Sequence, residues 1–93
     1  MEGEGEYKAE KGLIRVSLKA TEGEIESIII SGDFFLYPED KLWALEQSLL
    51  GCRLNRETLL NRIRDFYKKH WISSPGVKPE DFVTAILKAS KSE

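Results

Sequence analysis

Hydrophobic and polar residues alternate along the first part of the chain, and this pattern predicts β-strands. Apolar and polar side chains alternate from Tyr7 to Ala9, and a polar turn with a glycine follows at residues 10–12. The alternation returns from Leu13 to Ala20, with the apolar side chains on one face. A period of two places neighbouring side chains on opposite faces of a sheet. We therefore expect these two segments to form an antiparallel hairpin.

A third strand is predicted from Ile25 to Ser31. It follows a second polar turn at residues 21–24, which also contains a glycine. Three isoleucines stand in succession from Ile28 to Ile30, and β-branched residues favour extended backbone. Because consecutive side chains point to opposite faces, this strand should be apolar on both faces near its end.

Beyond the third strand, apolar residues recur every three or four positions, which indicates helices. We expect the first helix to begin near Pro38, because proline fits the first helical turn, and to stop at Gly51. A second helix should be capped by Asn55 and end at His70, and a third should open at Pro79. Residues 90–93 should fray. The apolar stripe expected on the first helix comprises Leu42, Leu45 and Leu49, widened by Trp43 and Leu50.

Strands followed by helices predict an α+β fold, a three-stranded antiparallel sheet followed by three helices packed on one face, in the order β-β-β-α-α-α. The 93 residues are expected to form a single domain, residues 1–93, with its core at about residues 7–88. No apolar run reaches the roughly 18 residues of a membrane span, and the acidic start lacks the features of a signal peptide. We therefore expect a cytoplasmic protein that does not enter a membrane.

Residue types that carry chemistry are scarce. The chain has one cysteine, Cys52, and one histidine, His70, too few for a four-ligand zinc site, so no metal site is expected. No phosphate-binding loop and no serine-histidine-acid set is present, and we assign no catalytic residue. Cys52 stands among leucines, which favours a small side chain buried in the core. The neighbouring Arg53 favours the alternative, a reactive thiol, and the sequence leaves both interpretations open.

Charge is divided unevenly along the chain. Residues 1–40 hold ten acids and four bases, whereas residues 41–93 hold six acids and ten bases. Such a division either orients docking onto a charged partner or reflects solvated helix faces. A sequence pI near 5.5 argues against a general nucleic-acid binder, and no nucleic acid is expected as a partner.

The most informative segment runs from Gly32 to Phe35, between the third strand and the first helix. Phe34 and Phe35 are adjacent aromatics that point in opposite directions if the backbone is extended. One ring then enters the core while the other faces outward as an interface anchor. The alternative is a tight turn, with Asp33 in a turn hydrogen bond and both rings buried. The sequence leaves these two readings open.

Taken together, several segments resemble the C-terminal domain of lipoate-protein ligases. The resemblance covers about residues 7–88, and its most specific element is the run from Ser31 to Phe35. The other segments that carry the resemblance are Lys11 to Val16, Gly23 to Ile28, Pro38 to Asp40, Leu42 to Gly51 and Pro79 to Val83.

This resemblance implies a non-catalytic accessory subunit, since the large ligase domain that binds lipoate and ATP and forms lipoyl-adenylate is absent. Some archaeal ligases of this kind carry the small domain on a separate chain. The chain is then expected to form a heterodimer with the catalytic subunit, with lipoyl-acceptor domains as further partners. ATP, Mg and lipoate would act only in that complex. The residues expected at or near the contact are Lys11, Gly32, Asp33, Phe34 and Phe35.

A second hypothesis comes from a different class of protein. Strands followed by helices in a small domain also resemble iron-sulfur assembly factors, for which the chain would serve as a sulfur acceptor or scaffold. That role requires Cys52 to be an exposed thiolate.

Overall fold

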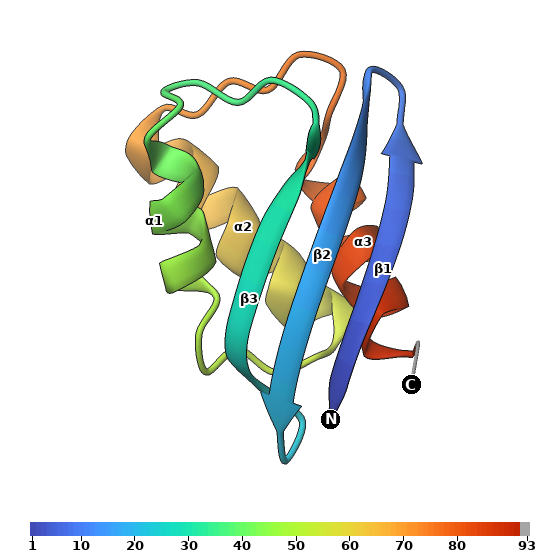
Figure 1. Cartoon of the computed structure of the whole chain (residues 1–93). Coiled ribbons are helices and arrows are strands. Elements are labelled where there is room, and N and C mark those ends of the chain that lie inside the picture. Colours follow the sequence, from blue (N-terminus) through green and yellow to red (C-terminus); the bar gives the residue numbers. More distant parts are fainter. Residues whose placement is uncertain (92–93) are drawn as a thin grey trace.

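The computed structural model describes residues 1–91 and contains the expected order of elements (Figure 1). An antiparallel sheet with strand order β1-β2-β3 precedes three helices, which confirms the α+β fold. The elements are β1 (Glu2–Ala9), β2 (Gly12–Thr21), β3 (Glu24–Asp33), α1 (Lys41–Ser48), α2 (Arg56–His70) and α3 (Pro79–Ser90).

The first strand is longer than the sequence predicts. β1 begins at Glu2 rather than at Tyr7 and pairs with β2 along its whole length, from Glu2 opposite Lys19 to Ala9 opposite Gly12. Its first half alternates exposed glutamates with half-buried glycines. This alternation has the period of a strand, but glycine is not a hydrophobic residue, so the pattern of apolar side chains did not reveal it.

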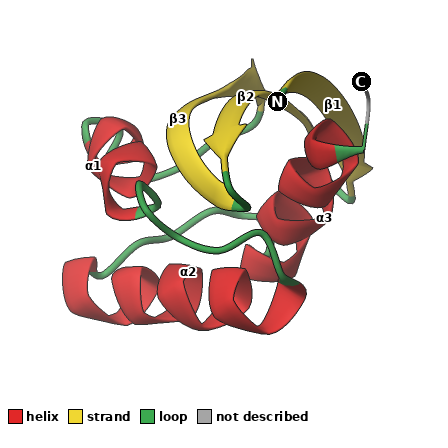
Figure 2. Cartoon of the chain, turned by 90° about the horizontal axis from the view of Figure 1, so that it is seen from below, coloured by secondary structure: helices red, strands yellow, loops and turns green. Residues whose placement is uncertain are grey.

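All three helices cover one face of the sheet (Figure 2). α3 contacts β1 and β2, α1 contacts β3, and α2 contacts both other helices. The approach of α3 is close because Gly5 has no side chain: a Cβ atom there would lie 2.5 Å from the backbone nitrogen of Ala89. The residues that fill the space between the sheet and the helices include Ile14, Val16, Leu45, Leu59, Ile63, Phe82 and Ile86.

The start of the first helix differs from the prediction. α1 begins at Lys41, not near Pro38. Residues 38–40 form a turn, in which the backbone nitrogen of Lys41 donates to the carbonyl of Pro38. Just before this turn, Tyr37 and Ser73 exchange two backbone hydrogen bonds, of 2.7 and 2.9 Å. Because this pairing joins segments far apart in the sequence, local residue preferences did not indicate it.

The apolar stripe of α1 is also narrower than predicted. Leu45 and Leu49 are fully buried and Leu42 packs against the core, as expected. Trp43 and Leu50 do not widen the stripe, because both are exposed. The short helix lies beside the edge strand β3, so only one side of it faces the core.

α1 also ends earlier than predicted, at Ser48, and Gly51 follows three residues later in the left-handed conformation with φ of 81°. The boundaries of the other two helices agree with the sequence. The Asn55 side chain accepts a hydrogen bond of 2.8 Å from the backbone nitrogen of Thr58 at the start of α2. α2 ends at His70, and Trp71 follows in the left-handed conformation with φ of 54°. α3 begins with Pro79 and ends at Ser90. Of the residues expected to fray, 92–93 lie outside the described part of the chain.

Candidate functional site

Three connections meet at one end of the sheet, which we call the loop end (Figure 1). They are the β1–β2 turn, the β3–α1 connection and the α2–α3 connection. The backbone nitrogen of Lys11 in the first donates to the carbonyl of Gly76 in the third, at 3.1 Å. The second and third are joined by the Tyr37–Ser73 pair. Backbone hydrogen bonds thus tie the three connections into one surface.

Side-chain hydrogen bonds from Ser74 and Tyr67 stabilise the α2–α3 connection. The Ser74 hydroxyl donates to the carbonyl oxygen of Val77 at 2.6 Å. Since serine has one hydroxyl proton, the Tyr67 hydroxyl donates to Ser74 Oγ across 2.8 Å. Burial raises the pKa of Tyr67 above its ordinary value, against a smaller opposing effect of the Ser74 hydrogen bond. The phenol therefore stays neutral and keeps its proton for this bond.

Phe34 and Phe35 point to opposite sides of the chain. Phe34 packs against the core, with its ring 5.4 Å from the ring of Phe82 in an edge-to-face arrangement. Phe35 is 63% exposed and stacks on Tyr37, with 6.2 Å between ring centroids and 3° between ring planes. The structure thus decides between the two readings of this segment: one ring is buried and the other faces outward.

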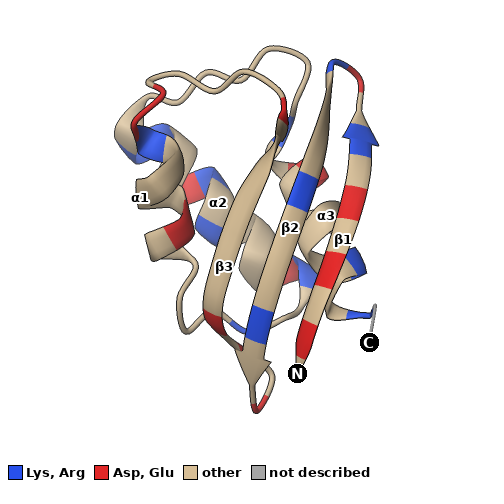
Figure 3. Ribbon diagram, viewed as in Figure 1, with Lys and Arg blue, Asp and Glu red and all other residues tan. Residues whose placement is uncertain are grey.

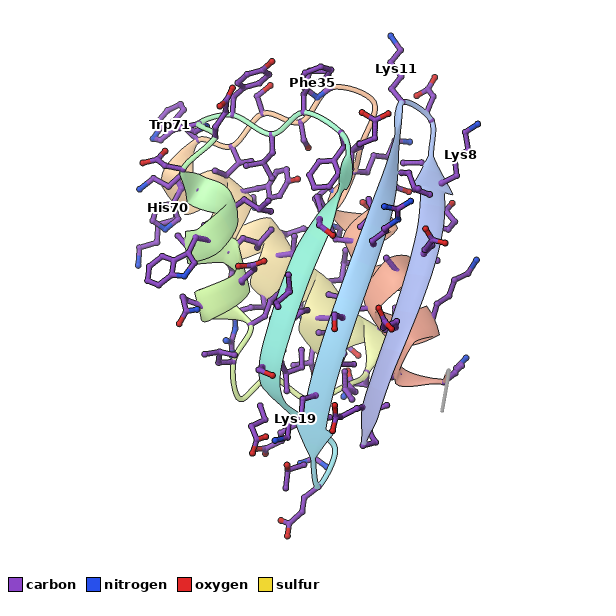
Figure 4. All side chains as sticks on the ribbon, in the orientation of Figure 1. Lys8, Lys11, Lys19, Phe35, His70 and Trp71 are labelled. Carbon is purple, nitrogen blue, oxygen red and sulfur yellow. The ribbon has the colours of Figure 1, made fainter. Side chains whose placement is uncertain are left out.

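Phe35, Tyr37 and Trp71 form the exposed aromatic surface of the loop end, and we call these three residues the aromatic surface. Tyr37 is 43% exposed and Trp71 is 88% exposed. Phe35 and Trp71 lie along the same end of the molecule (Figure 4). Exposed large aromatics are common anchors of protein interfaces, because they bury much area with little loss of side-chain entropy.

A hollow of about 370 Å³ opens beside the aromatic surface. Phe35 and Tyr37 form one side of it, and the end of β3 forms another. The complete lining is Ile30, Ser31, Gly32, Phe34, Phe35, Leu36, Tyr37, Glu39 and Leu42. Three of the five residues expected at a partner contact, Gly32, Phe34 and Phe35, thus line the same hollow.

The other expected residues lie near this hollow without lining it. Asp33 is exposed and stands opposite Leu13 in the β2–β3 register. Lys11 is exposed at the tip of the β1–β2 turn (Figure 4). Gly32 has φ of 133°, and a Cβ atom there would collide with the carbonyl of Leu13, so this position requires glycine for the backbone itself.

Sequence reasoning did not single out Tyr37 and Trp71 as site residues. Tyr37 stands two residues after Phe35, and its ring stacks on that of Phe35. Trp71 directly follows α2, adopts the left-handed conformation and is exposed. A tryptophan directly after a helical pattern is the one sequence signal that was available.

Cys52 is buried in the core, as the structural interpretation of this residue expected. Burial raises the pKa of the thiol, and the positive charge of Arg62 opposes this only in part. A buried thiol with a raised pKa does not support the sulfur-acceptor hypothesis. Among residues 1–91, no group of three or more His, Cys, Asp or Glu residues could hold a metal ion, and no helix is long and apolar enough to cross a membrane.

Acidic and basic residues lie along the strands of the sheet (Figure 3), and they occupy exposed positions of the outer face. Arg15 pairs with Glu6 at 2.7 Å, and Lys19 pairs with Glu26 at 3.1 Å. The Glu26 carboxylate, through its hydrogen bond and its charge, raises the pKa of Lys19. Because these acids already have basic neighbours, part of the uneven charge along the sequence is compensated on this face. The aromatic surface is therefore the better candidate for a contact.

Comparisons with known proteins agree on one family. The family model described as bacterial lipoate protein ligase C-terminus matches residues 3–86. The chain is 49% identical over 80 residues to lipoate-protein ligase A subunit 2 of Thermoplasma acidophilum, covering 86% of this chain and 82% of that protein. It also superposes on a chain from the solved structure of an archaeal lipoylation system, a bi-partite lipoate protein ligase and its E2 lipoyl domain from Thermoplasma acidophilum. That match has a TM-score of 0.84 and 45% identity and covers 92% of this chain and 94% of the other.

Proposed function

Because this chain belongs to the family of the bacterial lipoate protein ligase C-terminus, we propose that it is the non-catalytic small subunit of a bipartite lipoate-protein ligase. Its counterpart in Thermoplasma acidophilum is named subunit 2 of such a ligase and is similar over most of its length. The chain is then an accessory subunit that binds the catalytic subunit and supports ATP-dependent formation of lipoyl-adenylate in protein lipoylation.

The observation that carries this proposal is the aromatic surface. Phe35, Tyr37 and Trp71 expose three large rings on connections that backbone hydrogen bonds and the Tyr67–Ser74 network hold in place. A preformed surface binds with little ordering cost, and exposed aromatics gain most from being covered. We propose that the catalytic subunit covers this surface.

The five expected site residues take separate roles in this proposal. Phe35 is the central anchor, and Phe34 fixes its direction by packing on Phe82. Gly32 allows the end of β3 to lie close to β2. Asp33 and Lys11 border the contact with one charge of each sign.

In this proposal the chain contributes to catalysis by positioning groups of the catalytic subunit, and its own side chains take no part in the chemistry. Covering one side of the active site of the catalytic subunit would exclude water and hold loops around ATP and lipoate in a productive geometry. ATP, Mg²⁺ and lipoate then bind in the heterodimer, and we assign none of them to this chain alone. Lipoyl-acceptor domains are further partners of the heterodimer, and we place the complex in the cytoplasm.

The test is lipoyl-adenylate formation by the catalytic subunit from the same source, supplied with ATP, Mg²⁺ and lipoate. We expect adenylate to accumulate when this chain is present and to fall to background when it is left out. The same rate with and without the chain would contradict the proposal. Adenylate formation by this chain alone would contradict its non-catalytic role.

A further inference from the structure

A second concave surface lies between α1 and α2, and we call it the α1–α2 groove. Its volume is about 600 Å³, enough for one or two large side chains. Trp43, Ala44, Gln47 and Ser48 of α1 line one side of it, and Arg62, Asp65, Phe66, Lys69 and His70 of α2 line the other.

The groove has an apolar floor and an exposed aromatic rim. Phe66 is almost fully buried, and its ring centroid lies 4.3 Å from that of His70. Trp43 is 67% exposed at the edge of the groove. Trp43 is not among the residues that pack against the core, whereas Leu45 and Leu49 are fully buried in it. An exposed tryptophan over an apolar floor is well suited to receive an apolar side chain of a partner.

The charges that face the groove are mostly positive. Arg62 and Lys69 are cationic, and Asp65 contributes the one carboxylate of the lining. Arg62 donates to the carbonyl oxygen of Ser48 at the end of α1, which holds its guanidinium across the groove. Among residues 1–91, Lys69 takes part in none of the ion pairs present. A carboxylate of a partner would complement this arrangement.

The groove and the aromatic surface contain consecutive residues of the chain. His70 lines the groove, and Trp71 is the next residue in the chain and belongs to the aromatic surface (Figure 4). The backbone nitrogen of Trp71 donates to the carbonyl of Tyr67, which fixes the junction between the two surfaces. A partner that covers Trp71 is therefore well placed to reach along α2 to Trp43.

From these observations, and resting on the proposed function, we propose that the α1–α2 groove is a second contact for the catalytic subunit, which inserts an apolar side chain beside Trp43 and directs a carboxylate to Lys69. The aromatic surface supplies the apolar anchor of the complex. The groove adds a charge-dependent contact, which makes docking sensitive to salt.

The test measures the affinity of the complete chain for the catalytic subunit from the same source by titration calorimetry, at low and at high salt. Trp43→Ala should weaken binding at both salt concentrations, by about tenfold or more. Lys69→Glu should weaken binding strongly at low salt and less at high salt, since screening reduces the repulsion it introduces.

Two matched variants serve as controls. Ile29→Ala removes an apolar side chain that is 62% exposed on the outer face of the sheet. Lys8→Glu reverses a charge on the exposed side of β1. Both should bind like the wild type, and thermal unfolding of every variant verifies that the domain is folded.

Two outcomes separate this inference from the proposed function. If Phe35→Ala weakens binding while Trp43→Ala and Lys69→Glu bind like the wild type, the groove is not a contact and the proposed function stands. If the wild-type chain does not bind the catalytic subunit, both proposals fail.

Discussion

Phe34 and Phe35 are neighbours in the chain whose side chains serve two purposes. Phe34 packs edge-to-face on Phe82 of α3, and the ring of Phe35 faces outward. Stacking on Tyr37 holds Phe35 in place while leaving most of it exposed. A packing contact of one residue thus orients the interface contact of the next.

The burial of the Cys52 side chain can be tested through the reactivity of its thiol. Because the thiol is buried and its pKa is raised, we expect native Cys52 to react with a thiol reagent on the order of a hundredfold more slowly than an exposed cysteine. In denaturant the two should react at similar rates. The exposed reference is Ser27→Cys in a Cys52→Ala background, followed by absorbance of the released chromophore.

Rapid labelling of native Cys52 at the rate of the Ser27→Cys reference would overturn the buried assignment. It would also restore the sulfur-acceptor hypothesis, which requires an accessible thiolate.

Side-chain positions could be predicted where the local pattern decides them, and not elsewhere. The burial of Cys52 followed from its leucine neighbours. Which of Phe34 and Phe35 is buried could not be predicted, because it depends on the contact with Phe82 of the distant helix α3. The exposure of Trp43 depends on where the helix lies against the sheet, which the sequence does not specify.

The start of α2 is defined by the side chain of Asn55. Asn55 has extended backbone with φ of −130° and ψ of 152°, and its side chain accepts from Thr58 in the first helical turn. We expect Asn55→Ala to lower the free energy of unfolding by about 1 kcal/mol, because one backbone donor at the helix start loses its partner.

Chemical denaturation of Asn55→Ala measures this loss. Asn61→Ala serves as the control, because Asn61 is exposed in the middle of the same helix. Equal stability of the Asn55→Ala variant and the wild type would show that the cap contributes nothing to the fold.

Elements with local signals were predicted well, and those that depend on distant contacts were not. Asn55 and Pro79 marked the starts of α2 and α3 correctly. Pro38 did not mark the start of α1, because residues 38–40 form a turn between the Tyr37–Ser73 pair and the helix. β1 was predicted too short, since its glycines contribute backbone pairing and close packing rather than apolar side chains.

At the scale of the whole molecule, the outer face of the sheet differs in character from the loop end and the α1–α2 groove. The outer face of the sheet carries exposed ion pairs between neighbouring strands. The loop end and the adjoining α1–α2 groove expose aromatic rings. A chain of 93 residues has a small core, so covering these rings with a partner would add stability as well as function.

The most direct test of the docking role is the initial rate of lipoyl-adenylate formation by the catalytic subunit at increasing concentrations of this chain. The account predicts that the rate rises to a plateau with the wild type, and that Phe35→Ala needs about tenfold more protein to reach the same plateau. A shift in concentration at an unchanged plateau is expected because Phe35 supplies binding and no chemistry. A rate that does not depend on the concentration of this chain, or a Phe35→Ala curve that coincides with the wild type, would contradict it.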